Sequence, residues 1–490
     1  MKYHSTRNTG EKYTASEAIA RGLAPDGGLF VPDELPTVSA RELDELLKLD
    51  YRGRAVKIMS KFLAGYTQEE LEAFTARAYG ENFDCSEIAP LHFTDDGTAF
   101  LELWHGPTCA FKDMALQMLP QLLTASLKKT GEKRTVCILV ATSGDTGKAA
   151  LEGFKDVEGT KIFVFYPKNG VSDIQRLQMV TQEGKNVGVC GVTGNFDDAQ
   201  TGVKQVFSDE AAAARLNKAG YFLSSANSIN WGRLLPQIVY YFSAYCDYVN
   251  AGKLKMGEEL VFCVPTGNFG NILAGWYAAR MGLPVAKFVC ASNENNVLTD
   301  FIHTGTYDKN RRFHQTISPS MDILVSSNLE RLLYSMSGDE TVRWYMQKLG
   351  SKGKYTVSQS VFDAVRRDFA AGCCTDVETK RAIRAVFEEK NYLMDTHTAV
   401  AYKVLCDYRA ETGDARPAVV VSTASPFKFA ADVLDALGET ASVRPMEQLA
   451  EKSGLPVPAP LADLDKRNVR FDDSATRLEM RGKVVKFLSE

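Results

Sequence analysis

Lys112 is the residue whose position best suits covalent chemistry. It lies in the run Leu101–Asp113, LELWHGPTCAFKD, where an apolar stretch ends in a loop and the chain enters an apparent helix over 114–119. A lysine amine can form a Schiff base with a carbonyl compound. By residue type alone, a lysine beside Phe111 at a helix start is more commonly a surface residue. Later loops in the chain bear on which interpretation holds.

Three apolar strands are predicted to end in small, polar loops that open helices. The loops are Thr142–Gly147, Thr266–Asn271 and Ser422–Ser425. In open parallel sheets, ligands bind beyond the carboxyl ends of the strands. Free N–H groups and the helix dipole at a helix start attract anions. Each loop is therefore a potential anion site.

The Thr266–Asn271 loop is the best phosphate cradle of the three. Gly267 and Gly270 allow close backbone approach, and Asn268 and Asn271 add side-chain donors. A tight strand–helix turn without a ligand is the alternative. The 142–147 loop fails the P-loop pattern, because Thr142 stands where the first glycine belongs and Ala149 follows Lys148. No loop contains G-x-G-x-x-G, so ATP and dinucleotides are both disfavoured.

These parts together suit pyridoxal phosphate. That cofactor needs a lysine, donors for its phosphate and a partner for its pyridine nitrogen. The hydroxyl of Ser422 or Thr423 can face the nitrogen, and the 142–147 loop can receive a substrate carboxylate. A hydroxyl, unlike a carboxylate, does not hold the ring nitrogen protonated. Such a partner favours elimination and replacement over transamination.

The amino-acid composition limits the kinds of partner and cellular compartment that we expect for the protein. The chain has 490 residues, 45% hydrophobic and 24% charged, with a formal net charge of −4 and no basic block, so we expect no nucleic-acid partner. The ten cysteines include no C-x-x-C, which predicts neither a metal site nor a disulfide framework and favours a reducing cytoplasm. The polar N-terminus shows no signal peptide, and no run nears about 18 apolar residues, so no membrane span is expected.

The predicted elements divide the chain. Residues 1–95 are predicted to be mainly helical, with capping boxes at Ser39–Glu42 and Thr67–Glu70 and a boundary near Pro90. From residue 96 strands alternate with helices, which indicates an α/β fold with a largely parallel sheet. The expected strands are Thr135–Val140, Lys161–Tyr166, Val187–Val192, Leu260–Val264, Ala286–Ala291 and Ala418–Val421. Residues 300–417 are predicted to be mostly helical, and periodicity does not explain Ser318–Ile323.

Seven motifs, in order, resemble the threonine synthase family over nearly the whole chain. They are STR at Ser5–Arg7, GLAPDGGLFVP at Gly22–Pro32, HGPTCAFKD at His105–Asp113, ATSGDTG at Ala141–Gly147, SANSINWGR at Ser225–Arg233, PTGNFGN at Pro265–Asn271 and STASPFKF at Ser422–Phe429. The resemblance implies a tryptophan synthase β-like fold (fold type II), with two parallel-sheet lobes and a mainly helical N-terminal domain. The implied divisions are 1–95, 96–440 with a smaller lobe nested at about 115–235, and a C-terminal segment, 441–490, packing on the core.

The resemblance also implies an activity and a set of roles. The family converts O-phospho-L-homoserine and water to L-threonine and phosphate. Lys112 would be the Schiff-base lysine and main acid–base, next to Phe111, and Thr423 would face the ring nitrogen. Cofactor phosphate would be held by Gly267, Asn268, Phe269, Gly270 and Asn271. Substrate-binding residues would be Ser143, Gly144, Asp145 and Thr146 for the carboxylate or ring, and Asn227, Ser228, Asn230 and Arg233, with Lys148 possible, for the substrate phosphate.

One loop departs from the family pattern, and two alternative functions stay open. Relatives commonly read S/T-A-H-P-A-K-F, whereas Ser425 and Phe427 stand here for the His and Ala, so rate or preference would differ. His105 is expected to shape its loop and not to act as a base. The alternatives are a related phosphohomoserine lyase or serine/threonine dehydratase giving a 2-oxo acid, and a non-catalytic protein that inherited the fold. Without a plant-type N-terminal extension, S-adenosylmethionine activation is not implied, and a monomer is expected.

Overall fold

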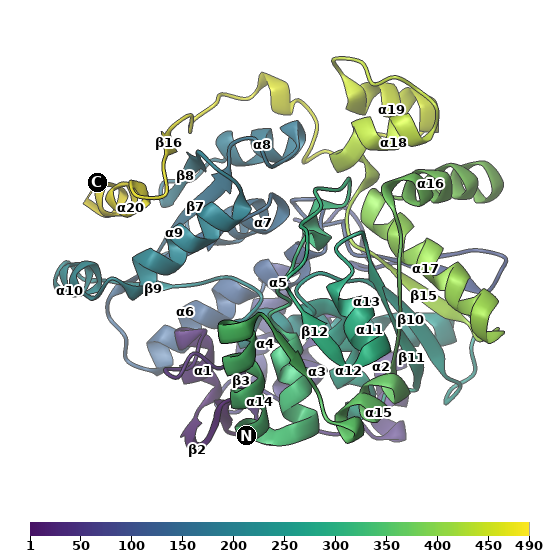
Figure 1. Cartoon of the computed structure of the whole chain (residues 1–490), viewed down its shortest axis with the longest axis horizontal. Helices are drawn as coiled ribbons and strands as arrows, with labels where there is room; N and C mark the ends of the chain where they lie inside the picture. The colour runs from purple at the N-terminus through teal and green to yellow at the C-terminus, as the bar shows by residue number, and fades with distance from the viewer. Residues whose placement is uncertain (490) are drawn as a thin grey trace.

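The computed structural model describes residues 1–489, apart from the side chains of Asp197, Ser208 and Glu210. Its first part, drawn in purple in Figure 1, combines a small sheet with helices. The sheet has the antiparallel order β2-β1-β3, with β1 Tyr3–Ser5, β2 Asn8–Tyr13 and β3 Phe30–Pro32. The helices are α1 Ala15–Arg21, α2 Ala40–Leu47, α3 Tyr51–Ser60 and α4 Gln68–Ala78. The two predicted capping boxes are present at α2 and α4, but the sheet was not predicted.

The larger lobe is built on a six-stranded sheet in the order β14-β11-β10-β15-β5-β4. All neighbours are parallel except β4 and β5. Its strands are β4 Leu91–Phe93, β5 Thr98–Glu102, β10 Leu260–Pro265, β11 Val285–Ser292, β14 Phe369–Cys373 and β15 Ala418–Ser422. Every residue of β10 and β15 is buried, as expected for central strands of a covered parallel sheet. Strand β4, which begins directly after Pro90, belongs to this sheet, so the last residues of the segment 1–95 lie in the larger lobe.

The smaller lobe, at the upper left of Figure 1, has a five-stranded parallel sheet in the order β16-β8-β7-β6-β9. The strands are β6 Thr135–Ala141, β7 Thr160–Pro167, β8 Val187–Val192, β9 Tyr221–Ser224 and β16 Ser474–Ala475. Its helices are α6 Leu119–Lys129, α7 Asp145–Phe154, α8 Asp173–Val180, α9 Phe196–Ser208 and α10 Glu210–Lys218. Buried β-branched and aromatic runs made the first three of these strands predictable.

The remaining helices cover the larger sheet or join the parts. They are α5 Lys112–Leu116, α11 Trp231–Asn250, α12 Gly270–Met281, α13 Val297–Thr304, α14 Leu329–Lys352, α15 Gln359–Asp368, α16 Asp376–Lys390 and α17 Thr396–Thr412. A short hairpin, β12 Thr306–Asp308 with β13 Lys354–Thr356, and the 3-10 turn η1 Pro319–Met321 complete this part. The helix predicted over 114–119 instead begins at Lys112, ends at Leu116 and restarts as α6, whose first turn contains Pro120.

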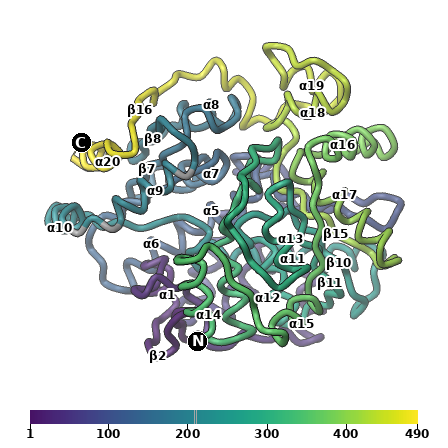
Figure 2. Tube along the Cα trace, viewed as in Figure 1, coloured from purple at the N-terminus to yellow at the C-terminus, as the bar shows by residue number. Residues whose placement is uncertain are grey.

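The C-terminal segment crosses from the larger lobe to the smaller one, as the yellow trace in Figure 2 shows. It runs through η2 Pro426–Phe429, α18 Ala430–Ala436, α19 Pro445–Ser453 and η3 Leu464–Lys466 before β16 and α20 Met480–Ser489. The segment therefore contributes an edge strand to the nested lobe. Within residues 1–489, no helix is long and apolar enough to cross a membrane.

Candidate active site

The loop that carries Lys112 is held against the 422–425 loop by backbone contacts. The Phe111 N–H donates to the Thr423 carbonyl at 2.8 Å, and Ala110 forms an antiparallel bridge with Ala424. These loops follow β5 and β15, which are neighbours in the larger sheet. Two of the predicted site segments are thus brought together by strand pairing, although about 310 residues separate them along the chain.

Lys112 is buried at the start of α5 and only 8% exposed. Its Nζ lies 3.4 Å from Asp145 Oδ2 and 3.3 Å from Ser320 Oγ, and 4.7 Å from the centre of the Phe111 ring. Burial lowers the pKa of Lys112, Asp145 opposes that shift, and Lys428 lowers the pKa further. An amine that loses its proton more readily than usual is suited to Schiff-base formation and proton transfer.

Asp145 is the carboxylate at the centre of the site. Its Oδ1 lies 2.7 Å from Lys428 Nζ and accepts from Gln175 Nε2 at 2.8 Å. Burial alone would raise the pKa of Asp145, but the Lys428 and Lys112 ammonium groups outweigh it and hold the pKa far below its usual range. An ionised carboxylate repels a substrate carboxylate, so Asp145 suits the other predicted position, beside the cofactor ring. Of the 143–146 set, Ser143, Gly144 and Thr146 remain for that group, at the start of α7.

The Gly267–Asn271 loop forms a tight cradle between β10 and α12. Phe269 adopts the left-handed conformation, with φ 61°, while its ring packs on Phe369 in the core. Asn271 accepts hydrogen bonds from the buried hydroxyls of Tyr240 and Tyr241, which leaves its Nδ2 donor without a partner among the described residues. A buried, unpaired donor calls for a ligand acceptor. Because the Phe269 ring packs in the core, this residue can bind an anion only through its backbone.

A Cβ added at Gly267 would lie 2.7 Å from the Ser320 carbonyl oxygen. The cradle and the 318–321 turn are therefore packed backbone against backbone, and the same turn points Ser320 Oγ at Lys112. Sequence reasoning missed Ser320. The available signal was the aperiodic Ser318–Ile323 stretch, which breaks a mostly helical region.

Sequence reasoning also missed a buried histidine–aspartate pair behind the 318–321 turn. His397 Nε2 accepts the Ser320 N–H at 3.2 Å, and His397 Nδ1 lies 2.7 Å from Asp395 Oδ2. The Asp395 carboxylate caps α17, where it accepts from the backbone N–H groups of His397 and Thr398. This arrangement places the proton of His397 on Nδ1 and leaves Nε2 as the acceptor that holds Ser320.

The 225–233 segment brings a second unpaired donor to the site. Arg233 is buried, its Nη1 donates to the Ala226 carbonyl at 2.9 Å, and its Nε has no partner among the residues described. Burial lowers the pKa of the Arg233 guanidinium to about 10. Ser228 Cβ lies 3.8 Å from where a Gly270 Cβ would be, so this segment borders the cradle. Asn227 lies in the same turn, beside Ser228.

Two residues predicted for the substrate phosphate are committed elsewhere. Asn230 caps α11, accepting from the Gly232 N–H at 2.8 Å and donating to the Ile19 carbonyl at 3.1 Å. Lys148 pairs with Glu152 at 2.9 Å and donates to Gln182. Both side chains are buried with these partners, and their part in holding the substrate phosphate stays a prediction. His105 contacts Asp84 and Glu102, in keeping with a loop-shaping role.

The residues present fit pyridoxal phosphate. A buried lysine with a lowered pKa lies beside a cradle whose glycine admits no side chain and whose asparagine keeps a free donor. A family model described as "Pyridoxal-phosphate dependent enzyme" matches residues 99–424. Fold and site together define a pyridoxal-phosphate-dependent enzyme of fold type II.

Comparisons with known proteins show which family of pyridoxal-phosphate-dependent enzymes the chain resembles. Models described as "Threonine synthase N terminus" and "Threonine synthase, C-terminal" match residues 2–79 and 398–485. Threonine synthase of Pseudomonas aeruginosa is 38% identical over 96% of this chain and 95% of its own length. The crystal structure of pyridoxal-phosphate-bound threonine synthase from Brucella melitensis superposes with a TM-score of 0.88, at 38% identity and full coverage of both chains. The chain belongs to the threonine synthase family.

One group of relatives is longer than this chain. "Threonine synthase-like 1" of Homo sapiens is 43% identical over 434 residues, which are 86% of this chain and 58% of that protein. The chain thus spans less than two thirds of the length of these relatives.

Proposed function

We propose that the protein converts O-phospho-L-homoserine and water to L-threonine and phosphate, as the last step of threonine biosynthesis. The observation that carries this is a buried Lys112 amine together with two separate unpaired donors, Asn271 Nδ2 in the cradle and Arg233 Nε in the segment that borders it. The first suits the cofactor phosphate and the second suits a phosphate on the substrate. Relatives that match nearly the whole chain are named for this reaction.

Each part of the site has a proposed role toward the cofactor. Lys112 would hold it covalently beside Phe111, and Thr423 would face its ring nitrogen. The Gly267–Asn271 loop, with Gly267, Asn268, Phe269, Gly270 and Asn271, holds its phosphate. When bound, pyridoxal phosphate takes up the electrons released when a proton leaves the substrate Cα.

The side chains around Lys112 supply the proton transfers. Lys112 Nζ removes the Cα proton and then a Cβ proton, and phosphate leaves from Cγ toward Arg233, Asn227 and Ser228. Cγ then takes up a proton and becomes the methyl group, water adds its hydroxyl at Cβ, and Lys112 returns a proton to Cα, while the third proton leaves on the phosphate. Ser320 Oγ, 3.3 Å from Nζ, holds the amine in position between these transfers. Ser143, Gly144 and Thr146 hold the substrate carboxylate at the start of α7.

Product analysis distinguishes this reaction from its alternatives. The holoenzyme supplied with O-phospho-L-homoserine is expected to release L-threonine and phosphate in equal amounts, and Lys112→Ala is expected to abolish both. Phosphate matched by 2-oxobutyrate would establish the lyase in place of the synthase. A cofactor-loaded protein that releases neither would contradict both and favour a non-catalytic role. The relatives named "synthase-like" make the carbon product the decisive measurement.

Location, assembly and domain division belong to the same proposal. All ten cysteines are free, which suits a reducing cytoplasm. We propose a monomer, to be tested by the mass of the holoenzyme in solution. We also keep the division into an N-terminal domain ending before Leu91, a catalytic core to about residue 440 and a C-terminal segment.

A further inference from the structure

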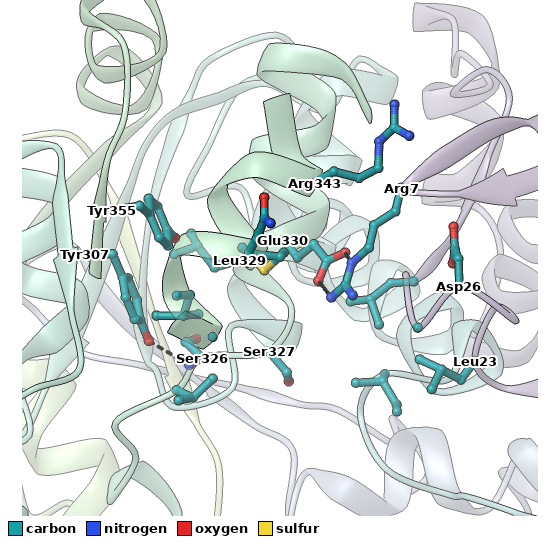
Figure 3. A pocket seen from close by; sticks show the side chains of 18 of the residues that line it. Arg7, Leu23, Asp26, Tyr307, Ser326, Ser327, Leu329, Glu330, Arg343 and Tyr355 are labelled. Atoms are coloured by element: carbon teal, nitrogen blue, oxygen red, sulfur yellow. Dashed lines mark hydrogen bonds and ion pairs between the residues drawn. The ribbon is translucent and has the colours of Figure 1, made fainter. Parts of the chain in front are cut away.

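A cavity of about 860 Å³ lies beside the cofactor cradle. Figure 3 shows it between Arg7 and Asp26 of the N-terminal domain, the 326–330 segment, and Tyr307 and Tyr355 of the hairpin. Lys204 of α9 also lines it. All three parts of the molecule therefore meet at this cavity.

The inner wall of the cavity is also the outer support of the cradle. Ser326 Oγ donates to the Gly267 carbonyl at 2.7 Å, while the Ser326 N–H donates to the Tyr307 hydroxyl at 2.8 Å. Ile229, another lining residue, follows Ser228, which borders Gly270. The cavity therefore lies next to the proposed phosphate-binding segments.

The charges that line the cavity do not balance. Arg7 is neutralised by Glu330, which it contacts through Nε and Nη2 at 2.8 Å each. Arg343 is exposed at the rim in Figure 3, and neither it nor the Lys309 ammonium has an ion-pair or hydrogen-bond partner among the described residues. The carboxylate of Asp26 is occupied by the Ser5 hydroxyl and the Gly28 N–H. These neutral donors leave Asp26 its negative charge, but the Arg343 and Lys309 cations still lie at this concave surface outside any ion pair among the described residues.

We propose that this cavity is an anion-collecting mouth of the active site, where Arg343 and Lys309 bind the phosphate dianion of the incoming substrate. Apolar walls formed by Leu23, Val325 and Leu329 strengthen the field of these cations. Phosphate held there lies against the 229 and 326–327 segments, from which it passes to Arg233. This inference rests on the proposed function, because it takes a phosphorylated amino acid as the ligand.

The test compares Arg343→Gln, Lys309→Gln and the double variant with Lys348→Gln as a matched control. Lys348 is on the same helix as Arg343, but its Nζ lies over the Trp344 ring and outside the cavity. We expect kcat/KM for O-phospho-L-homoserine to fall about 3- to 10-fold in each single variant and about tenfold or more in the double, with kcat within about twofold. The salt dependence of kcat/KM should flatten in parallel.

Inhibition by inorganic phosphate supplies the second readout. Its inhibition constant should rise in the double variant by a factor similar to the loss in kcat/KM, and Lys348→Gln should change neither. The proposed role of the cavity would be overturned if the phosphate inhibition constant of the double variant were unchanged. It would also be overturned if Lys348→Gln lost as much kcat/KM as the double variant. A wild-type holoenzyme that never acts on phosphohomoserine would instead overturn the proposed function, and phosphate binding followed by tryptophan fluorescence would still test Arg343 and Lys309.

Discussion

Asp145 lies between two lysines but binds them unequally. Its contact with Lys428 is 2.7 Å, whereas Lys112 Nζ is 3.4 Å away. Because Lys428 already neutralises the carboxylate, Asp145 retains the Lys112 proton only weakly, and burial lowers the pKa of Lys112 despite an adjacent anion. The Asp145 carboxylate can thus position the Lys112 amine without holding a proton on it.

Ser320 gives a residue-scale prediction. Removing its hydroxyl with Ser320→Ala takes away a partner of Lys112 Nζ without touching the cradle backbone. We expect kcat to fall about tenfold or more, with cofactor affinity within about twofold of wild type. Steady-state kinetics and titration of the apoenzyme with pyridoxal phosphate measure the two effects.

Ser320→Thr is the matched control, because it restores a hydroxyl at the same position. It should recover most of the activity lost in the alanine variant. If alanine and threonine variants were equally slow, the turn itself and not the hydroxyl would be what matters.

Among single residues, the sequence predicted those site residues that lie in a recognisable local pattern. Lys112 and the Gly267–Asn271 cradle lie at strand–helix junctions, where glycine, asparagine and hydroxyl residues cluster. Ser320 has no such mark, because its partners are the side chains of Lys112 and Asp145, more than 170 residues away. The capping role of Asn230 was not predicted, because a capping asparagine and a ligand-binding asparagine look the same in sequence.

At the scale of elements, the cradle depends on a turn that is not contiguous with it. The 318–321 turn packs its backbone on Gly267 and is fixed from behind by His397, which α17 carries and Asp395 orients. Three separate elements, α12, η1 and α17, therefore determine one phosphate site.

Gly267→Ala tests that dependence. The new Cβ would lie 2.7 Å from the Ser320 carbonyl oxygen, so either the cradle or the turn must move. We expect a loss of about 1–3 kcal/mol in stability and about a tenfold or greater rise in the dissociation constant of pyridoxal phosphate. Gly482→Ala is the control, because a Cβ there meets nothing within 4 Å. Normal cofactor affinity in Gly267→Ala would show that the cradle does not need this close approach.

Strands were predictable where burial on both faces makes them continuous apolar runs, as in β6, β7 and β10. Two of the missed strands are short edge elements. Strand β14, with the sequence FAAGC, and the two-residue β16 have neither length nor alternation, and only the neighbouring strands β11 and β8 make them part of a sheet. Such elements are set by tertiary pairing and carry little local signal.

At the scale of the whole molecule, Arg331 joins the N-terminal domain to the catalytic core. This fully buried side chain donates from Nε to the Phe30 carbonyl at 3.0 Å and from Nη2 to the Ile229 carbonyl at 2.7 Å. Its Nη1 donates to Asn328, whose own N–H holds the Asn268 carbonyl at 3.0 Å. A single guanidinium therefore links strand β3, the 225–233 segment and the Gly267–Asn271 cradle.

Arg331→Met keeps the apolar volume but leaves buried acceptors on three segments without a donor. We expect the free energy of unfolding of the holoenzyme, measured by urea denaturation, to fall by about 3 kcal/mol or more. Arg343→Met, in the part of α14 beyond the break at Gly338 and exposed, should change it by no more than about 0.5 kcal/mol. Because Phe30 loses its partner, hydrogen exchange should quicken across β1 and β3 before it does so in β10. Equal protection of β3 in both variants would mean that hydrophobic packing alone holds the N-terminal domain in place, and that Arg331 serves only the cradle.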